Sequence, residues 1–122
     1  GRMQEYSREL YNIVNDQEQK VDIIAGHQYE LGEKFIGEVP VFLHGHTHQF
    51  NISRSKETLI INAGTTGAAG VRGFKNDSEL PNSVALLHYA VQDGAPQLEI
   101  IDIIKFYVER SGFTLERRLV ED

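Results

Sequence analysis

The chain has 122 residues, five histidines, a formal net charge of −6 with those histidines neutral, and no cysteine or tryptophan. The lack of cysteine excludes a disulfide scaffold, a thiolate zinc site and a cysteine nucleophile. A hydrophobic content of 40% and a charged content of 25% are typical of a folded globular chain, and the length suits one domain over residues 1–122.

Helical and strand patterns alternate in the first part of the chain. Apolar side chains within Met3–Lys20 recur at three- and four-residue spacings, which predicts an amphipathic helix. The next patterns predict a strand, a short helix and a strand, at Val21–Ala25, Tyr29–Ile36 and Val39–Leu43. This order favours a parallel strand pair joined by a crossover, so that His27 and the segment His44–His48 leave the same edge of the sheet.

Short strands and tight turns dominate the rest of the sequence. A hairpin is predicted around Ser55-Lys56, and Asp93-Gly94 is a strong turn dipeptide. The segment Ala63–Gly73 is a glycine-rich loop that lacks the lysine and the following helix of a phosphate-binding P-loop. The predicted strands are Phe50–Arg54, Thr58–Asn62, Val84–Val91, Gln97–Val108 and Phe113–Val120. The sequence therefore predicts a mixed α/β (α+β) fold with a β-rich second half.

Four of the five histidines lie between positions 27 and 48, three of them in the run HGHTH at 44–48. Imidazole is the commonest nitrogen ligand of Zn, Mn, Fe and Ni in proteins. Residues two apart in an extended or loop segment project to the same side, so His46 and His48 are candidate metal ligands. His27, at the end of the neighbouring strand, is a third candidate. His44 lies in the strand itself and reads as a packing residue or a support for the ligands.

Three sequence elements resemble the calcineurin-like metallophosphoesterases. VFLHGHTHQF is similar to the strand and GHxH signature of that family, VDIIAGHQYE to its strand followed by a lone histidine, and LIINAGTTGAAGVRG to its strand and glycine-rich turn. The resemblance covers roughly residues 5–110. It implies a metallophosphoesterase-type αββα sandwich, of which this chain is the β-rich half, with a two-metal centre at the strand ends.

The same resemblance implies ligand roles and an activity. His27 and His46 would hold one ion and His48 the second, in a family that uses divalent Mn, Fe, Zn or Ni. A hydroxide bridging the two ions attacks the phosphorus of a phosphomonoester or phosphodiester substrate. Arg72, in the glycine-rich loop, either faces a substrate phosphate or pairs with a carboxylate, and the sequence leaves both roles open.

Several motifs of the family do not occur in this sequence: Asp-x-His, Gly-Asp-x-x-Asp and Gly-Asn-His followed by Asp or Glu. Without their carboxylates, two divalent ions would face only neutral imidazoles and repel each other unscreened. We therefore expect the chain to be the C-terminal half of a metallophosphoesterase. It would have no complete catalytic site, at most one weakly bound ion and no substantial phosphoesterase activity by itself.

Two alternatives from other functional classes remain open. One is a non-catalytic oligomerising or interaction module that carries a histidine-rich loop. The other is a mononuclear three-histidine metal protein, with Glu30 or Glu33 as the base if it is a hydrolase. A half-sandwich would expose apolar strand faces and unpaired edges, so we also expect a homo-oligomer.

The remaining polar features indicate structural roles and exclude some partners. His88, inside the apolar run VALLHYAV, reads as a structural or surface histidine, and Arg117-Arg118 reads as a solvated strand edge. The acidic balance and the scattered Lys and Arg residues argue against a binder of duplex nucleic acid. The sequence contains no signal-peptide pattern and no apolar run of the roughly 18 residues needed to span a membrane, so localisation stays open.

Overall fold

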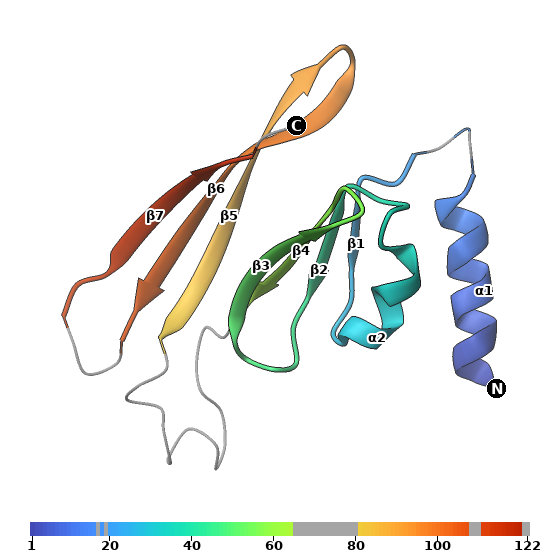
Figure 1. Ribbon diagram of the computed structural model, residues 1–122, viewed down its shortest axis with the longest axis horizontal. Helices are drawn as coiled ribbons and strands as arrows, with labels where there is room; N and C mark the ends of the chain where they lie inside the picture. Colours follow the sequence, from blue (N-terminus) through green and yellow to red (C-terminus); the bar gives the residue numbers. More distant parts are fainter. Residues whose placement is uncertain (17, 19, 65–80, 108–110, 121–122) are drawn as a thin grey trace. The chain divides into compact units, whose positions relative to one another are not determined.

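The computed structural model describes residues 1–16, 18, 20–64, 81–107 and 111–120. The chain divides into two compact units, an N-terminal unit over Gly1–Asn62 and a C-terminal unit over Ala63–Asp122. Figure 1 shows the elements along the chain and labels all of them except the 3₁₀ helix η1. They are α1 (Arg2–Val14), β1 (Ile23–Ala25), α2 (Tyr29–Gly32), the 3₁₀ helix η1 (Glu33–Phe35), β2 (Val41–His44), β3 (Phe50–Ser55), β4 (Thr58–Ala63), β5 (Asn82–Gln92), β6 (Ala95–Phe106) and β7 (Thr114–Leu119). Two sheets with few helices confirm the predicted mixed fold class.

The N-terminal unit is built on a four-stranded sheet in the order β1-β2-β4-β3. β1 and β2 are parallel, with Ile24 opposite Phe42, and β2 and β4 are parallel, with Phe42 opposite Ile60. The parallel pair predicted from the strand-helix-strand order is therefore confirmed. The apolar runs of β2 and β4 are buried, as expected for central strands of a parallel sheet.

The connection between β1 and β2 is helical, but it is not the single helix predicted over 29–36. α2 ends at Gly32 and passes into the 3₁₀ turn η1, and Gly37 follows with a φ of +95°. Gly32 sits so close to Phe42 that a Cβ atom there would lie 2.4 Å from the aromatic ring. The helix can therefore approach β2 only because this position has no side chain.

Helix α1 is also shorter than the predicted Met3–Lys20. It ends at Val14, and the Nδ2 atom of Asn15 donates a 2.8 Å hydrogen bond to the Tyr11 carbonyl. The Asp16 carboxylate then accepts a hydrogen bond from the backbone N–H of Glu18. Asn and Asp side chains compete with the helical hydrogen bonds in this way, and the run from Asn15 to Lys20 contains no apolar side chain. No helix within the described ranges is long and apolar enough to cross a lipid bilayer.

The C-terminal unit is an antiparallel sheet in the order β5-β6-β7 (Figure 1). Its three strands confirm the three strand predictions, with ends shifted by a few residues. Asp93 and Gly94 form the β5–β6 turn with φ values of 52° and 79°, as a tight hairpin turn requires. In the N-terminal unit, the turn between β3 and β4 has positive φ at Lys56 and Glu57, one residue later than the predicted Ser55-Lys56.

Candidate metal site

The carboxyl ends of β1 and β2 bring His27 and His46 together. The pairing of these strands continues past their ends, because the Gly26 N–H donates to the Leu43 carbonyl at 2.9 Å and the Gly45 N–H donates to the His27 carbonyl at 3.0 Å. The loop after β2 therefore begins beside the loop after β1. This geometry confirms that His27 and the HGHTH segment leave the same edge of the sheet.

The His46 Nδ1 atom lies 3.1 Å from the His27 Nε2 atom. The two rings are nearly perpendicular, with centroids 5.0 Å apart and an interplanar angle of 80°. Two imidazole nitrogens bound to one ion at about 2.1 Å are separated by about 3.0 Å at an octahedral angle and about 3.4 Å at a tetrahedral one. The observed separation fits two ligands of one ion, and without an ion it suits a hydrogen bond between the rings.

The loop that carries His46 and His48 has a left-handed backbone at both histidines. Their φ values are 75° and 63°, so the chain is not extended at either position. For a residue other than glycine, this conformation costs about 1–3 kcal/mol. Two of the three residues proposed as ligands carry this cost, as do the turn residues Lys56, Glu57 and Asp93.

A buried amide anchors this loop. The Nδ2 atom of Asn62 donates a 2.8 Å hydrogen bond to the Thr47 hydroxyl, between the two histidines. Asn62 is only 2% exposed and stands opposite His44 in the pairing of β4 with β2. Asn62 is not among the site residues predicted from the sequence, although its polar side chain at the end of the apolar run LIIN was a signal for such a role.

His44 belongs to the packing around the site. Its ring lies 5.4 Å from the rings of both Tyr29 and Phe42, centroid to centroid. Its Nδ1 atom is buried and, within the described residues, has no hydrogen-bond partner. With Ala25, Gly26, His27 and Leu43, it lines an open depression at the ends of β1 and β2. Of the two roles considered for His44, packing is the one whose contacts are visible.

The other candidate residues are not gathered with the pair. In the portion of the chain that is described, no three His, Asp or Glu side chains are grouped closely enough to hold a metal ion. His48 therefore does not complete a three-ligand group with His27 and His46. Glu30 and Glu33 are exposed on α2 and η1. Arg72 and most of the glycine-rich loop lie outside the described residues, and the ligand assignment stays a prediction.

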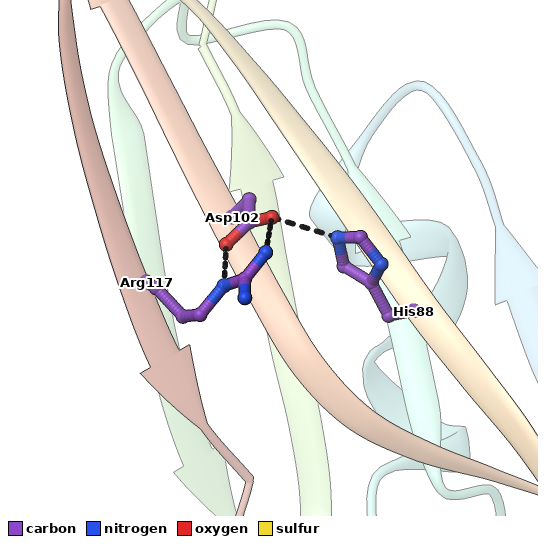
Figure 2. Close-up of polar contacts among 3 residues, drawn as sticks. All are labelled: His88, Asp102 and Arg117. Atoms are coloured by element: carbon purple, nitrogen blue, oxygen red, sulfur yellow. Dashed lines mark hydrogen bonds and ion pairs between the residues drawn. The ribbon is translucent and has the colours of Figure 1, made fainter.

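A second polar cluster, unanticipated by the sequence analysis, lies on the C-terminal sheet (Figure 2). The Arg117 Nε and Nη2 atoms donate hydrogen bonds of 2.7 and 2.8 Å to the two carboxylate oxygens of Asp102. The Nε2 atom of His88 lies 2.8 Å from the same carboxylate. These bonds outweigh the effect of burial and hold the pKa of Asp102 at about 2, with the Arg117 bond as the largest cause.

This cluster corrects the prediction that Arg117 is a solvated edge residue, and it identifies the contact of His88, which was predicted to be structural or on the surface. Arg117 is not simply a solvated edge residue, because it is the bidentate partner of a 4% exposed carboxylate. His88 has the structural role expected for it. An aspartate in the middle of the apolar strand LEIIDIIKF was the signal for a buried ion pair.

Comparison with known proteins supports the fold alone. No protein-family model matches this chain, and no curated protein matches it. The structure of Vacuolar Protein Sorting 29 from Cryptosporidium parvum is similar, at 15% identity and a TM-score of 0.50, over 78% of this chain and 45% of that one. A double mutant of Vps29 from Entamoeba histolytica has 17% identity and a TM-score of 0.49, over 77% of this chain and 48% of that one. Wild-type Vps29 from the same organism, complexed with Zn²⁺, has 16% identity and a TM-score of 0.49, over 91% and 75%.

The chain spans less than half the length of the first two of these structures. The likeness to the Cryptosporidium structure, which has a calcineurin-like metallophosphoesterase fold, supports the fold family that the sequence elements indicate. At this level of identity, activity and ligands do not follow from the fold.

Proposed function

We propose that this chain contributes His27 and His46 to a divalent-metal centre that serves the hydrolysis of phosphomonoesters or phosphodiesters. The observation that carries the proposal is the 3.1 Å separation of His46 Nδ1 and His27 Nε2 at the ends of two parallel strands. The resemblance of the HGHTH run to the GHxH signature supports the same site. Zn, Mn, Fe and Ni are the ions that suit imidazole ligands.

The donor set described here fits one side of a coordination shell. Two imidazoles supply two ligands, whereas a divalent transition metal takes four to six, so the remaining positions need water or groups outside the described residues. Among the described residues, no carboxylate is grouped with the pair to offset the charge of a second ion. We therefore propose that the chain alone binds at most one ion, weakly, and does not hydrolyse phosphoesters at the rate of a complete enzyme.

The residues of this chain hold and orient the site. His27 and His46 coordinate an ion only through unprotonated ring nitrogens, so protons compete with the metal and binding weakens as the pH is lowered. The Asn62–Thr47 hydrogen bond keeps the loop in the conformation that directs His46 toward His27. When bound, a divalent metal lowers the pKa of a coordinated water and stabilises charge on phosphoryl oxygens.

Isothermal titration with ZnCl₂ and MnCl₂ at pH 7.5 tests the proposal. The wild-type chain is expected to bind one ion, and H27A and H46A are each expected to lose most of that affinity. H88A is the matched control, because it removes an imidazole from the C-terminal sheet and should leave binding unchanged. Equal loss in all three variants, or no binding by the wild type, would contradict the assignment.

A phosphodiesterase assay with bis(p-nitrophenyl) phosphate and Mn²⁺ tests the statement that the site is incomplete. We expect the chain alone to show no turnover above the metal-only background. Turnover by the wild type that is abolished in H46A would show that the chain is a complete catalyst, and this part of the proposal would then be wrong.

The second candidate function is a non-catalytic interaction module. The observation that favours it is the exposure of large apolar side chains on the C-terminal sheet, with Leu86 46%, Leu115 54% and Leu119 72% exposed. The similar Cryptosporidium protein is itself named for vacuolar protein sorting. This candidate predicts no metal binding and a thermal unfolding midpoint that does not change on addition of EDTA.

A further inference from the structure

The outer edge of strand β7 has the backbone groups and the exposure needed to pair with another strand. β7 ends the sheet order β5-β6-β7, and all six of its residues are exposed. The Val120 N–H donates to the Glu99 carbonyl at 2.9 Å, so Val120 is a hydrogen-bonded position of the pairing with β6. In an antiparallel pair every second residue is hydrogen-bonded to the partner strand. Residues 114, 116, 118 and 120 therefore face β6, and the N–H and C=O groups of Leu115, Arg117 and Leu119 point away from β6, toward the outer edge of β7.

The side chains of β7 separate by chemistry between the two faces of the sheet. Glu116 and Arg118 share one face, where Arg118 Nε lies 2.7 Å from Glu116 Oε2. Leu115 and Leu119 share the other face with Arg117, and both leucines are more than half exposed. The strand thus carries one acid, one base and two apolar residues in a symmetric arrangement around position 117.

We propose that a second copy of this chain pairs with β7 in antiparallel orientation, centred on Arg117, so that the two sheets continue into one another. In this register Glu116 stands opposite Arg118 of the second copy, and Leu115 opposite Leu119 of the second copy. By the two-fold symmetry each pair occurs twice, as in other isologous interfaces. The inference does not depend on the proposed metal site.

The backbone and the side chains agree on this register. The outward-facing residues 115, 117 and 119 meet their counterparts as hydrogen-bonded pairs, which gives about six new backbone hydrogen bonds. Positions 116 and 118 become non-hydrogen-bonded pairs, in which Cα atoms approach to about 4.5 Å and side chains interact most strongly. The two opposite-charge pairs therefore form where cross-strand attraction is greatest.

Other registers are disfavoured. Centring the pair on Glu116 places the two Glu116 carboxylates directly opposite each other, which is destabilising. Centring it on Arg118 leaves neither Glu116 nor the leucines opposite a complementary side chain. A shift by a single residue sends apolar and charged side chains to the wrong faces.

The centre of the proposed interface puts Arg117 opposite Arg117 of the second copy. Repulsion between them is offset within each copy, because Asp102 holds the guanidinium through two hydrogen bonds on the β6 side. Each arginine is therefore part of a charge-balanced pair, with its side chain drawn inward from the edge.

Charge reversal with rescue tests the proposal, using sedimentation equilibrium of the full chain. The wild type is expected to dimerise, and R118E and E116R are each expected to raise the dissociation constant about tenfold or more, because two attractions become two repulsions. The double variant E116R/R118E restores both opposite-charge pairs and is expected to regain wild-type association. R54E is the matched control, since Arg54 is exposed on β3, an edge strand of the other sheet.

Disulfide trapping tests the register, because the chain has no cysteine of its own. In L115C/L119C the introduced thiols face each other across the interface at about 5.5 Å between Cα atoms, within disulfide range. In L115C alone the two thiols are four residues apart along the strand and one strand spacing apart across it, about 14 Å in all, so no cross-linked dimer is expected. Cross-linking only in the double variant supports the register.

Three results would overturn the proposal. The first is a wild-type chain that stays monomeric at about 1 mM, where even weak association is half complete. The second is dimerisation that R118E and R54E affect equally. The third is a dimer that L115C cross-links as efficiently as L115C/L119C. Circular dichroism of each variant confirms that its strands are intact before these comparisons are made.

Discussion

Asp102 and Arg117 stand directly opposite each other on β6 and β7 and are joined by two hydrogen bonds of 2.7 and 2.8 Å. The carboxylate is almost fully buried, while more than half of the arginine side chain is exposed. Charge-assisted bidentate bonds of this kind are among the strongest polar contacts in proteins. They align β7 with β6 although no residue of β7 is buried.

The stability of the fold should therefore depend on pH in the acid range. The pKa of Asp102 is lowered from 3.8 to about 2, so its contribution is complete above about pH 4 and is lost as the pH falls toward 2. Urea denaturation between pH 5 and pH 2 measures this. We expect the unfolding free energy of the wild type to fall more steeply than that of D102N. Parallel curves would show that the ion pair does not contribute.

Gly32 should not tolerate even one added methyl group. G32A places a Cβ atom 2.4 Å from the Phe42 ring, which must move out of the core of the N-terminal unit. We expect a loss of about 1–3 kcal/mol in unfolding free energy, as for other overpacked sites. G26A is the control, because the nearest atom to its Cβ would be 3.9 Å away. Equal stability of the two variants would mean that the helix α2 moves away at little cost.

The buried hydroxyl of Thr58 joins two otherwise separate backbone groups. It donates a 2.6 Å hydrogen bond to the Val39 carbonyl and accepts a 2.7 Å bond from the Gly37 N–H. T58V keeps the volume but leaves both groups unpaired, and we expect it to cost about 1–3 kcal/mol. T58S keeps both bonds and should be clearly less destabilised. Thermal unfolding of the two variants distinguishes the loss of hydrogen bonds from a change in packing. A T58S variant as unstable as T58V would show that packing causes the destabilisation.

The Thr47 hydroxyl should matter for metal binding without touching the metal. T47V removes the acceptor for the Asn62 amide and leaves the His46 loop without this anchor. Loss of supporting hydrogen bonds around metal ligands typically lowers affinity about 10- to 100-fold, and we expect the low end of that range for Zn²⁺. T47S, which keeps the hydroxyl, should bind as the wild type does. Unchanged affinity in T47V would show that the backbone alone sets the loop.

Local patterns in the sequence were sufficient for most of the fold. The apolar-rich segments Val84–Val91 and Gln97–Val108 and the Asp93-Gly94 turn predicted β5 and β6, and the strand-helix-strand order predicted the parallel pair that brings His27 beside the HGHTH run. The ends of the helices were harder to predict from the sequence. The sequence predicted a helix that runs to Lys20, but the side chains of Asn15 and Asp16 form local hydrogen bonds that end it at Val14.

Contacts between distant residues could not be predicted in the same way. Asn62 meets Thr47 and Arg117 meets Asp102 across 15 residues of sequence each. Such partners depend on strand register, which period-two patterns leave open along the strand direction. The left-handed backbone of His46 and His48 was also not foreseen, because residues other than glycine seldom adopt it.

Nuclear magnetic resonance of the imidazole nitrogens tests most directly whether His27 and His46 are two ligands of one metal ion. During titration with Zn²⁺ at pH 7.5, we expect the resonances of His27 Nε2 and His46 Nδ1 to shift together, while those of His88 do not move. Repeating the titration at a lower pH should give weaker binding, because protons compete with the metal for the imidazole nitrogens. Resonances of His27 and His46 that stay unchanged at saturating Zn²⁺, or that shift no more than those of His88, would contradict this ligand assignment.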